Sequence, residues 1–409
     1  MKKILIVFSA LLLMHNGAYC QNDNPRLYNR SSLYSVLLVD PSKRMSQEII
    51  NSFLELPVPD KYNDHNLSLR YIVVAKRDQK SRDLEQNLSE FIYQNQIPKR
   101  MIAKWFDRDL TDGSFDVSTI MERGYYNASV SDISVAMKSQ RGYAMLSDAG
   151  EQLIKNSFLI INNITYVDKE QNAQIVAGVF SIMGAAFGMA GGGVGSLGKS
   201  VSDLAQSISK TVAGFTVKVN TLLYQLEWND EIANAFYSQY YYDKSGFDKQ
   251  KKQAFENEKD LFKLKYIGEV TAISDKTVMR GLKSPDEVFR KVLARAIDKN
   301  IVALQKEFVV FKVVVPVYQV QGDKVLVQIG LKEGVSANSK YEVIERVEDA
   351  NGNITYQRKG IIKPIPNKIW DNRYMAVEEE ADNALLKYTT FEVVSGNGFY
   401  PGMLVREIR

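Results

Sequence analysis

The sequence predicts an α+β protein in which a layered α/β sandwich domain is followed by a small SH3-like β-barrel. Short apolar runs alternate with helically spaced segments in the first part of the chain, which is typical of a layered α/β or α+β domain. A long amphipathic segment, 284–307, closes that part. After residue 308, short valine-rich runs are separated by Gly and Asn turn signals, which favours a small β-barrel.

The segment 284–307 predicts the helix that joins the two parts. Ser284 can cap it, Pro285 fits its first turn and Glu287 completes a capping box. Apolar residues recur in two adjacent rows, so one broad face is expected to pack on a sheet. The other face is expected to contact solvent, and it carries Arg290, Lys291, Arg295, Asp298, Lys299 and Lys306.

The elements before this helix follow from apolar runs and their spacing. Strands are expected at 33–40 and 67–75, because both are short apolar runs. Helical spacing predicts helices at 42–56 and 77–96. The segments 102–106 and 115–121, on either side of Asp112-Gly113, predict a β-hairpin. Further strands are expected at 158–168, 215–228 and 265–273, with the first two paired.

An uncharged insertion separates the two paired strands. Residues 173–198 are rich in Gly, Ala, Met and Phe, and 201–212 have helical spacing. The length allows a membrane span, and the small residues would let helices approach closely. The alternative is an ordered lid or a subunit contact in a soluble protein. The candidate membrane or oligomer contacts are Val179, Phe180, Met183, Phe187 and Met189.

The last part predicts a barrel of short strands. The expected strands are 308–317, 324–329, 340–347, 355–365, 373–378, 391–394 and 403–408. Turn signals such as Asn351-Gly352 separate them. The chain is therefore divided into a signal peptide at 1–20, an α/β domain at 21–307 with the insertion at 173–212, and a barrel domain at 308–409.

Residues 1–20 have the pattern of a signal peptide. Lys2 and Lys3 precede the apolar run 4–14, and cleavage before Gln21 suits the small residues that precede it. The alternative is a lipoprotein acylated at Cys20. Either pattern directs the chain to the periplasm or to the periplasmic face of the outer membrane.

Composition argues against several classes of function. Cys20 is the only cysteine, and His65 is the only histidine outside the signal sequence, so thiolate chemistry and the usual zinc and nucleophile–base sites lack their residues. A net charge of +4 on 409 residues is no footprint for nucleic acid. We therefore expect no catalytic, cofactor-binding or metal-binding residues and no nucleic-acid partner.

Three local patterns could carry chemistry. Residues 193–200 match the P-loop pattern, but the run before them is not a β-branched strand and an exported chain meets little nucleotide, so no nucleotide partner is expected. Asp107, Asp109, Asp112 and Asp116 form an acidic cluster that lacks the calcium-loop spacing, and a solvated hairpin is the simpler interpretation. The aromatic run 236–242 could stack on sugar or peptide, although packing is the more common role.

Two resemblances follow from the order of elements and from short phrases. The strands at 33–40, 158–168, 215–228 and 265–273, with the helix that contains Ala294-Arg295-Ala296-Ile297, resemble the curli assembly/transport component family. The tail resembles the C-terminal barrel of the flagellar assembly protein T family, in Val325-Leu326-Val327-Gln328-Ile329-Gly330, Gly334-Val335, Tyr341-Glu342-Val343-Ile344 and Gly402-Met403-Leu404-Val405. The first resemblance implies an anticodon-binding-like α/β domain in an oligomeric, non-catalytic envelope protein.

These observations favour a non-enzymatic envelope protein of a Gram-negative bacterium. It would mediate oligomerisation or the docking of other envelope proteins at the periplasmic side of the outer membrane. One alternative is an export-channel component that contacts the membrane through 173–212. A second alternative is a hydrolase that uses the carboxylates of residues 107–116.

Overall fold

The computed structural model describes residues 32–41, 45–56, 67, 70–73, 81–118, 120, 153–168, 212–279, 284–348, 354–378 and 381–408. The predicted signal peptide, His65 and the P-loop-like residues 193–200 lie outside the described residues. The candidate contacts between Val179 and Met189 also lie outside them.

A five-stranded mixed sheet forms the first part of the fold, in the order β2-β1-β3-β4-β5. β1 runs parallel to both β2 and β3, whereas β3, β4 and β5 are successively antiparallel. The predicted pairing of the segments 158–168 and 215–228 is therefore confirmed. The strands are β1 Ser32–Val39, β2 Tyr71–Val73, β3 Ser157–Asp168, β4 Val212–Leu226 and β5 Leu264–Met279.

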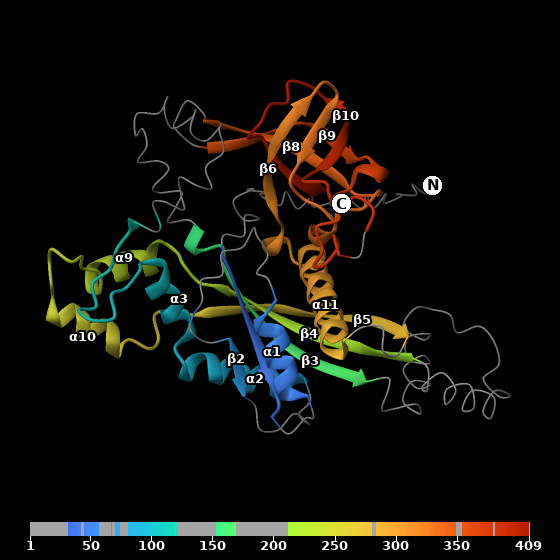
Figure 1. Ribbon diagram of the computed structural model, residues 1–409. Helices are drawn as coiled ribbons and strands as arrows, with labels where there is room; N and C mark the ends of the chain where they lie inside the picture. Colours follow the sequence, from blue (N-terminus) through green and yellow to red (C-terminus); the bar gives the residue numbers. More distant parts are fainter. Residues whose placement is uncertain are drawn as a thin grey trace, which may run out of the picture.

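Helices cover both faces of this sheet (Figure 1). On one face, α1 (Ser46–Leu54) and α11 (Pro285–Glu307) enclose a core with Leu37, Phe158 and Val217. The other face packs against a second core, which includes residues of α2, α3, α9 and α10. Those four helices are Ser81–Gln94, Ile97–Trp105, Asp230–Gln239 and Lys249–Asn257. The alternation of side chains along each strand supplies both cores.

α11 confirms the predicted packing of the joining helix on the sheet. It contacts β4 and β5 along its length, and Leu293, Ala296 and Leu304 are fully buried. A broad apolar stripe is what a helix needs to cover two neighbouring strands. Arg290 also forms a 2.6 Å ion pair with Glu55, just after α1.

A row of buried polar groups crosses the sheet beneath α11. Asn162 of β3 donates to the Ser35 hydroxyl at 3.1 Å and accepts from the Thr221 hydroxyl at 2.8 Å. Asn300 of α11 donates to that hydroxyl at 2.7 Å and to the Val219 carbonyl at 2.8 Å. Buried polar groups require such partners, so this row fixes the helix over one position on the sheet.

A closed antiparallel barrel forms the second part, in the order β10-β7-β6-β11-β8-β9. Its strands are β6 Val314–Gln321, β7 Lys324–Val327, β8 Lys340–Glu348, β9 Ile354–Pro364, β10 Thr389–Gly396 and β11 Leu404–Ile408. Valines and Phe391 fill its centre. Mixed helix and strand content with a closed barrel agrees with the predicted α+β class.

Three predicted strands in this description are wrong. The segment 115–121 is not a strand, because residues 115–117 are irregular and residues 118 and 120 are helical. The segment 102–106 is not a strand but the end of helix α3, because Ile97, Met101, Ile102 and Trp105 share one buried face. The segment 373–378 is not a strand but a series of turns. In addition, the first barrel strand begins at Val314, because Val309–Phe311 forms a 3-10 turn.

Two predictions about α11 also need correction. Ser284 precedes the helix, but its side chain makes no capping hydrogen bond. The charged face is not simply a solvent face, because Lys291 is only 7% exposed and Asp298 is partly buried. Turns of the barrel lie close to Asp298 and contact Val302, which sequence spacing alone does not show.

Among the described helices, none combines the length and the apolar character that crossing a membrane requires.

Candidate functional site

β5 forms a long edge of the five-stranded sheet. It pairs with β4 from Leu264, opposite Leu226, to Met279, opposite Val212. Among the described residues, no strand pairs with its other side. The opposite edge is the three-residue strand β2, and the barrel is closed, so β5 is the long edge of the described fold.

The hydrogen bonds around Ile273 show which backbone groups of β5 point outward. Ile273 lies opposite Lys218, whose carbonyl is directed towards β3 and accepts from the Thr165 hydroxyl at 3.4 Å. Because pairs alternate in an antiparallel ladder, the N–H and C=O of Ile273 point away from β4. Lys299 Nζ donates to this carbonyl at 2.9 Å, from the outer side. By the same alternation, Thr271 and Asp275 also present their backbone groups outward.

Polar side chains accompany the outward groups along one face of β5. Asn220 of β4 donates to Glu269 at 3.0 Å and accepts from Thr271 at 3.0 Å. Thr216 donates to Asp275 at 2.5 Å. These bonds orient the side chains across β4 and β5, so a strand added to the edge would meet an ordered polar row.

Lys299 is held at this edge by its surroundings. Burial lowers its pKa, as does the positive charge of Arg373 from the barrel, whereas the carboxylate of Asp275 acts in the opposite direction. Its hydrogen bond to the Ile273 carbonyl fixes the ammonium group against the edge strand, although much of the side chain is exposed.

The barrel meets α11 through a tight turn, η3 (Leu331–Glu333), and the residues that follow it. Gly334 has φ +82°, and a Cβ there would overlap Val302 of α11. Glu333 accepts from the Gly330 amide at 2.7 Å and from Asn372 at 2.8 Å. The turn is therefore rigid where it touches the helix.

Charged groups from both sides meet at this contact. Burial raises the pKa of Asp298 to about 6, despite the nearby cations Lys332, Arg295 and Arg373, and Glu333 raises it further. One carboxylate oxygen of Asp298 is buried without a hydrogen-bond partner among the described residues. Burial therefore favours the neutral, protonated form of the Asp298 side chain over the carboxylate.

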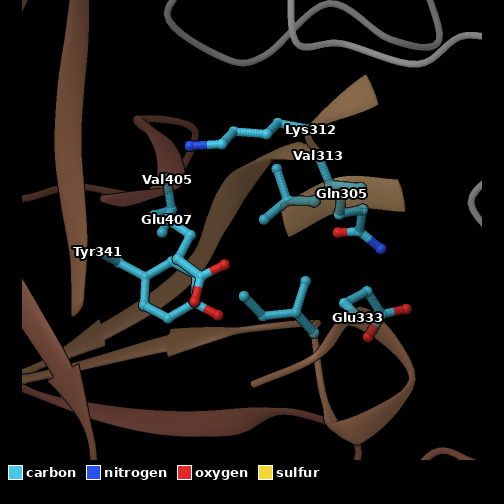
Figure 2. Close-up of a pocket in the computed structure, with 9 residues that line it drawn as sticks. Gln305, Lys312, Val313, Glu333, Tyr341, Val405 and Glu407 are labelled. Atoms are coloured by element: carbon cyan, nitrogen blue, oxygen red, sulfur yellow. The ribbon is translucent and has the colours of Figure 1, made fainter. Parts of the chain in front are cut away.

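A cavity of about 20 Å³ lies beside this contact, at the mouth of the barrel (Figure 2). Figure 2 shows Tyr341 and Glu407 on one side and Gln305 and Glu333 on the other. Burial raises the pKa of Tyr341, and Glu407 accepts from Ser339 at 3.0 Å. The volume suits one water molecule, and the lining offers it several polar partners.

A larger crevice of about 220 Å³ lies at the carboxyl ends of β1 and β3. β1 lies between its two parallel neighbours, because the chain forms β2 on one side of β1 and then crosses to form β3 on the other side. Open α/β sheets bind ligands at the carboxyl ends of the strands where the strand order reverses in this way. Asp40 is 5% exposed, and Ser46 Oγ donates to its carbonyl at 2.7 Å. Residues 42–44, which follow closely, lie outside the described residues. The full lining is Leu38, Val39, Asp40, Ser46, Ile49, Ile164, Thr165 and Tyr166.

Three carboxylates of the acidic cluster, those of Asp109, Asp112 and Asp116, accept hydrogen bonds from the backbone amides of the turns that follow them. Asp109 accepts from the Thr111 amide at 2.7 Å, and this bond lowers its pKa. Hydrogen bonds from Ser114 and Ser118 lower the pKa of Asp112 and Asp116 in the same way. The four residues lie in a loop after α3, and not in the predicted hairpin. Asp109 also pairs with Lys244 at 3.4 Å.

The aromatic run 236–242 serves packing. Phe236 is fully buried, with its ring 4.4 Å from Phe106 and 5.1 Å from Phe115. Tyr242 donates to the Asp112 carbonyl at 2.7 Å and so joins the run to the acidic loop. The contact with Phe106 is tilted and the one with Phe115 is edge-to-face, and aromatic contacts of both kinds stabilise a core. These contacts therefore support the interpretation that the run packs in a core.

Sequence reasoning did not identify β5 as an edge strand. It predicted the strand at 265–273 but gave no sign that it would be an edge. The signal that could have indicated an edge is the mixture of charges in the strand, with Lys265, Glu269, Asp275 and Lys276. In the part of the chain that the structure describes, no cluster of side chains has the composition of a metal site.

A comparison with protein-family models gave no match to the chain, and a comparison with curated proteins gave none either.

Proposed function

We propose that this protein is a non-enzymatic cell-envelope protein that associates with copies of itself, and docks other envelope proteins, at the periplasmic side of the outer membrane. The observation that carries this proposal is that, among the described strands, β5 pairs on one side alone, with β4. The compartment rests on the signal pattern of residues 1–20.

A long edge strand favours association because the N–H and C=O groups that point away from the sheet can form hydrogen bonds with a strand of another chain. β5 has 16 residues, so its edge extends over about 50 Å at roughly 3.3 Å per residue. It contains no proline to interrupt pairing. Its two basic and two acidic residues balance, so two copies of the strand carry no net repulsion.

A second copy of the chain is the first partner we expect. Pairing one β5 with another is an isologous contact, which closes into a dimer with two-fold symmetry. The barrel, which we propose to be of the SH3-like type, would remain available for other envelope proteins. Its rigid contact with α11 through Gly334 and Val302 would hold it at a fixed position relative to the dimer.

Substitution at Thr271 tests the proposal. Its N–H points outward, so Thr271→Pro removes an edge donor without removing a β4–β5 hydrogen bond. Thr271→Val is the matched control, because it loses the same hydroxyl but keeps the N–H. In sedimentation velocity of the chain from Gln21 onward, we expect wild type and Thr271→Val to associate and Thr271→Pro to remain monomeric. Equal association of all three, or a wild-type monomer at the highest soluble concentration, contradicts the proposal.

An export-channel component is a second candidate, and the position of the insertion favours it. The chain leaves the sheet at Asp168 of β3 and returns at Val212 of β4, so the insertion joins the far ends of two antiparallel strands. A membrane-contacting segment at a hairpin tip could reach a bilayer without disturbing the sheet. Liposome flotation of the chain with and without residues 173–211 tests this, because only the intact chain should float.

A further inference from the structure

We propose that Lys299 is a gate on the β5 edge, which a pairing strand must displace before it can bind. This inference rests on the proposed function, because a gate matters only if the edge binds a strand. The observation is the hydrogen bond from Lys299 Nζ to the outward carbonyl of Ile273 at 2.9 Å.

Lys299 occupies a position that a partner strand would need. An added strand must donate an N–H to the Ile273 carbonyl, because that carbonyl points away from β4. The ammonium group already satisfies this acceptor, and a lysine beside an edge is one of the devices by which proteins prevent unwanted strand pairing. The bound cation also excludes the apolar side chains of an approaching strand.

The barrel contributes to the position of the gate. Arg373 lies close enough to lower the pKa of Lys299. Its guanidinium group forms a bidentate ion pair with Asp371, at 2.8 and 2.6 Å. Asp371 is only 4% exposed, so this pair is a fixed part of the barrel. On the other side, Asp275 of β5 attracts the ammonium group. Arg373 therefore repels the ammonium group from the barrel side and Asp275 attracts it from the strand side, and both effects favour its position at the Ile273 carbonyl.

The gate favours partner strands that carry acidic side chains over neutral strands. A partner strand that presents an acidic side chain opposite Lys299 offsets part of the cost of breaking the bond to the Ile273 carbonyl, whereas a neutral strand offsets none of it. In a pair of β5 strands, Glu269 and Asp275 can supply such a group. The gate therefore selects a second copy of this chain, or a strand with similar acidic residues, over a purely apolar strand.

The test measures self-association of the chain from Gln21 onward in three variants. Lys299→Met keeps the length of the side chain and removes the ammonium group, and we expect the association constant to rise at least about tenfold, because a two-fold dimer breaks a charge-assisted hydrogen bond at each of its two edges. Lys299→Arg keeps charge and donors, and should associate like the wild type. Lys306→Met, at the end of the same helix, is the control for added hydrophobicity and should leave association unchanged.

A double variant separates the gate from the proposed function. If Thr271→Pro abolishes the gain of Lys299→Met, the gain arises from strand pairing at β5, as expected. If Thr271→Pro weakens association but Lys299→Met does not strengthen it, the edge binds strands and the gate is wrong. A gain that persists in the double variant also overturns the gate, because it would come from apolar contact of the methionine. If Thr271→Pro has no effect in either background, the proposed function itself fails.

Discussion

Phe308 lies against Gly268, with its ring where a Cβ on this glycine would be. Gly268 has φ +157° and follows an irregularity in the pairing of β5 with β4, where the register shifts opposite Leu223 and Tyr224. Phe308 is the residue that ends α11. A glycine in the edge strand thus lets the end of the joining helix pack directly on the sheet.

Gly268→Ala should therefore destabilise the protein by at least about 2 kcal/mol. The added methyl group must displace the Phe308 ring, and the backbone at this φ is unfavourable for any side chain. Urea denaturation followed by circular dichroism measures the change. Gly246→Ala is the control, because a Cβ there meets only an Asp243 oxygen at 3.7 Å, and its effect should be small. Equal stability of the two variants would show that Phe308 can move without cost.

The raised pKa of Asp298 predicts that the free energy of unfolding depends on pH between about 4 and 6. Its pKa is raised from 3.8 to about 6, chiefly by burial, so the folded protein binds this proton more tightly than the unfolded chain. Above pH 6 the buried carboxylate destabilises the fold, and as the pH falls through 6 this cost disappears. The full effect is about 3 kcal/mol at 1.36 kcal/mol per pKa unit.

Asp298→Asn should remove this dependence. The variant should be more stable than the wild type at pH 7.5 and similar to it near pH 4, as measured by urea denaturation across that range. Asp286→Asn, on the exposed first turn of the same helix, should keep the wild-type profile. A wild-type profile that rises from pH 5 to 7 relative to Asp298→Asn would mean that Lys332, Arg295 and Arg373 outweigh burial.

The elements with strong local patterns were predictable from the sequence. The apolar rows of 285–307 and the alternation of 215–223 each determine one face of one element, and both were confirmed. The barrel strands followed from valine density and turn residues. The error at 102–106 arose because a short apolar run fits a helix as well as a strand.

The features that make the candidate site depend on contacts between distant segments. β5 is an edge because, among the described strands, it pairs with β4 alone, and the charges within 264–279 are only a weak local sign of that position. The burial of Asp298 likewise depends on barrel residues such as Lys332. Sequence spacing therefore assigned a whole charged face of α11 to solvent, when part of it contacts the barrel.

Thr221→Val should cost about 2 kcal/mol, although the two side chains have almost the same shape. The Thr221 hydroxyl accepts from Asn300 at 2.7 Å and donates to Asn162 at 2.8 Å, and all three residues are fully buried. Valine removes the hydrogen bond from this hydroxyl to the buried Asn162 oxygen. No interaction then offsets the free energy lost when that oxygen is removed from water. Thr165→Val, an exposed residue on β3, should change the free energy of unfolding little. Similar losses for the two variants would contradict a role for the buried row.

Glu342→Gln should weaken the barrel more than any exposed substitution. The Glu342 side chain is 2% exposed and binds two arginines, Arg406 of β11 and, at 2.5 Å, Arg358 of β9. It therefore joins β8 to both of its neighbours in the barrel. Neutralising the carboxylate leaves Arg406, 11% exposed, without its counter-charge, and breaking a buried pair in this way costs about 3 kcal/mol or more.

Hydrogen exchange of amides in β8 and β11 measures this loss where it occurs. Protection there should fall in Glu342→Gln, while amides of β3 and β4 should keep theirs, because the sheet has its own cores. Glu392→Gln, an exposed carboxylate on β10, should leave both sets unchanged. A parallel loss of protection in β3 and β4 would show that the contact of α11 with the barrel makes the two parts unfold together.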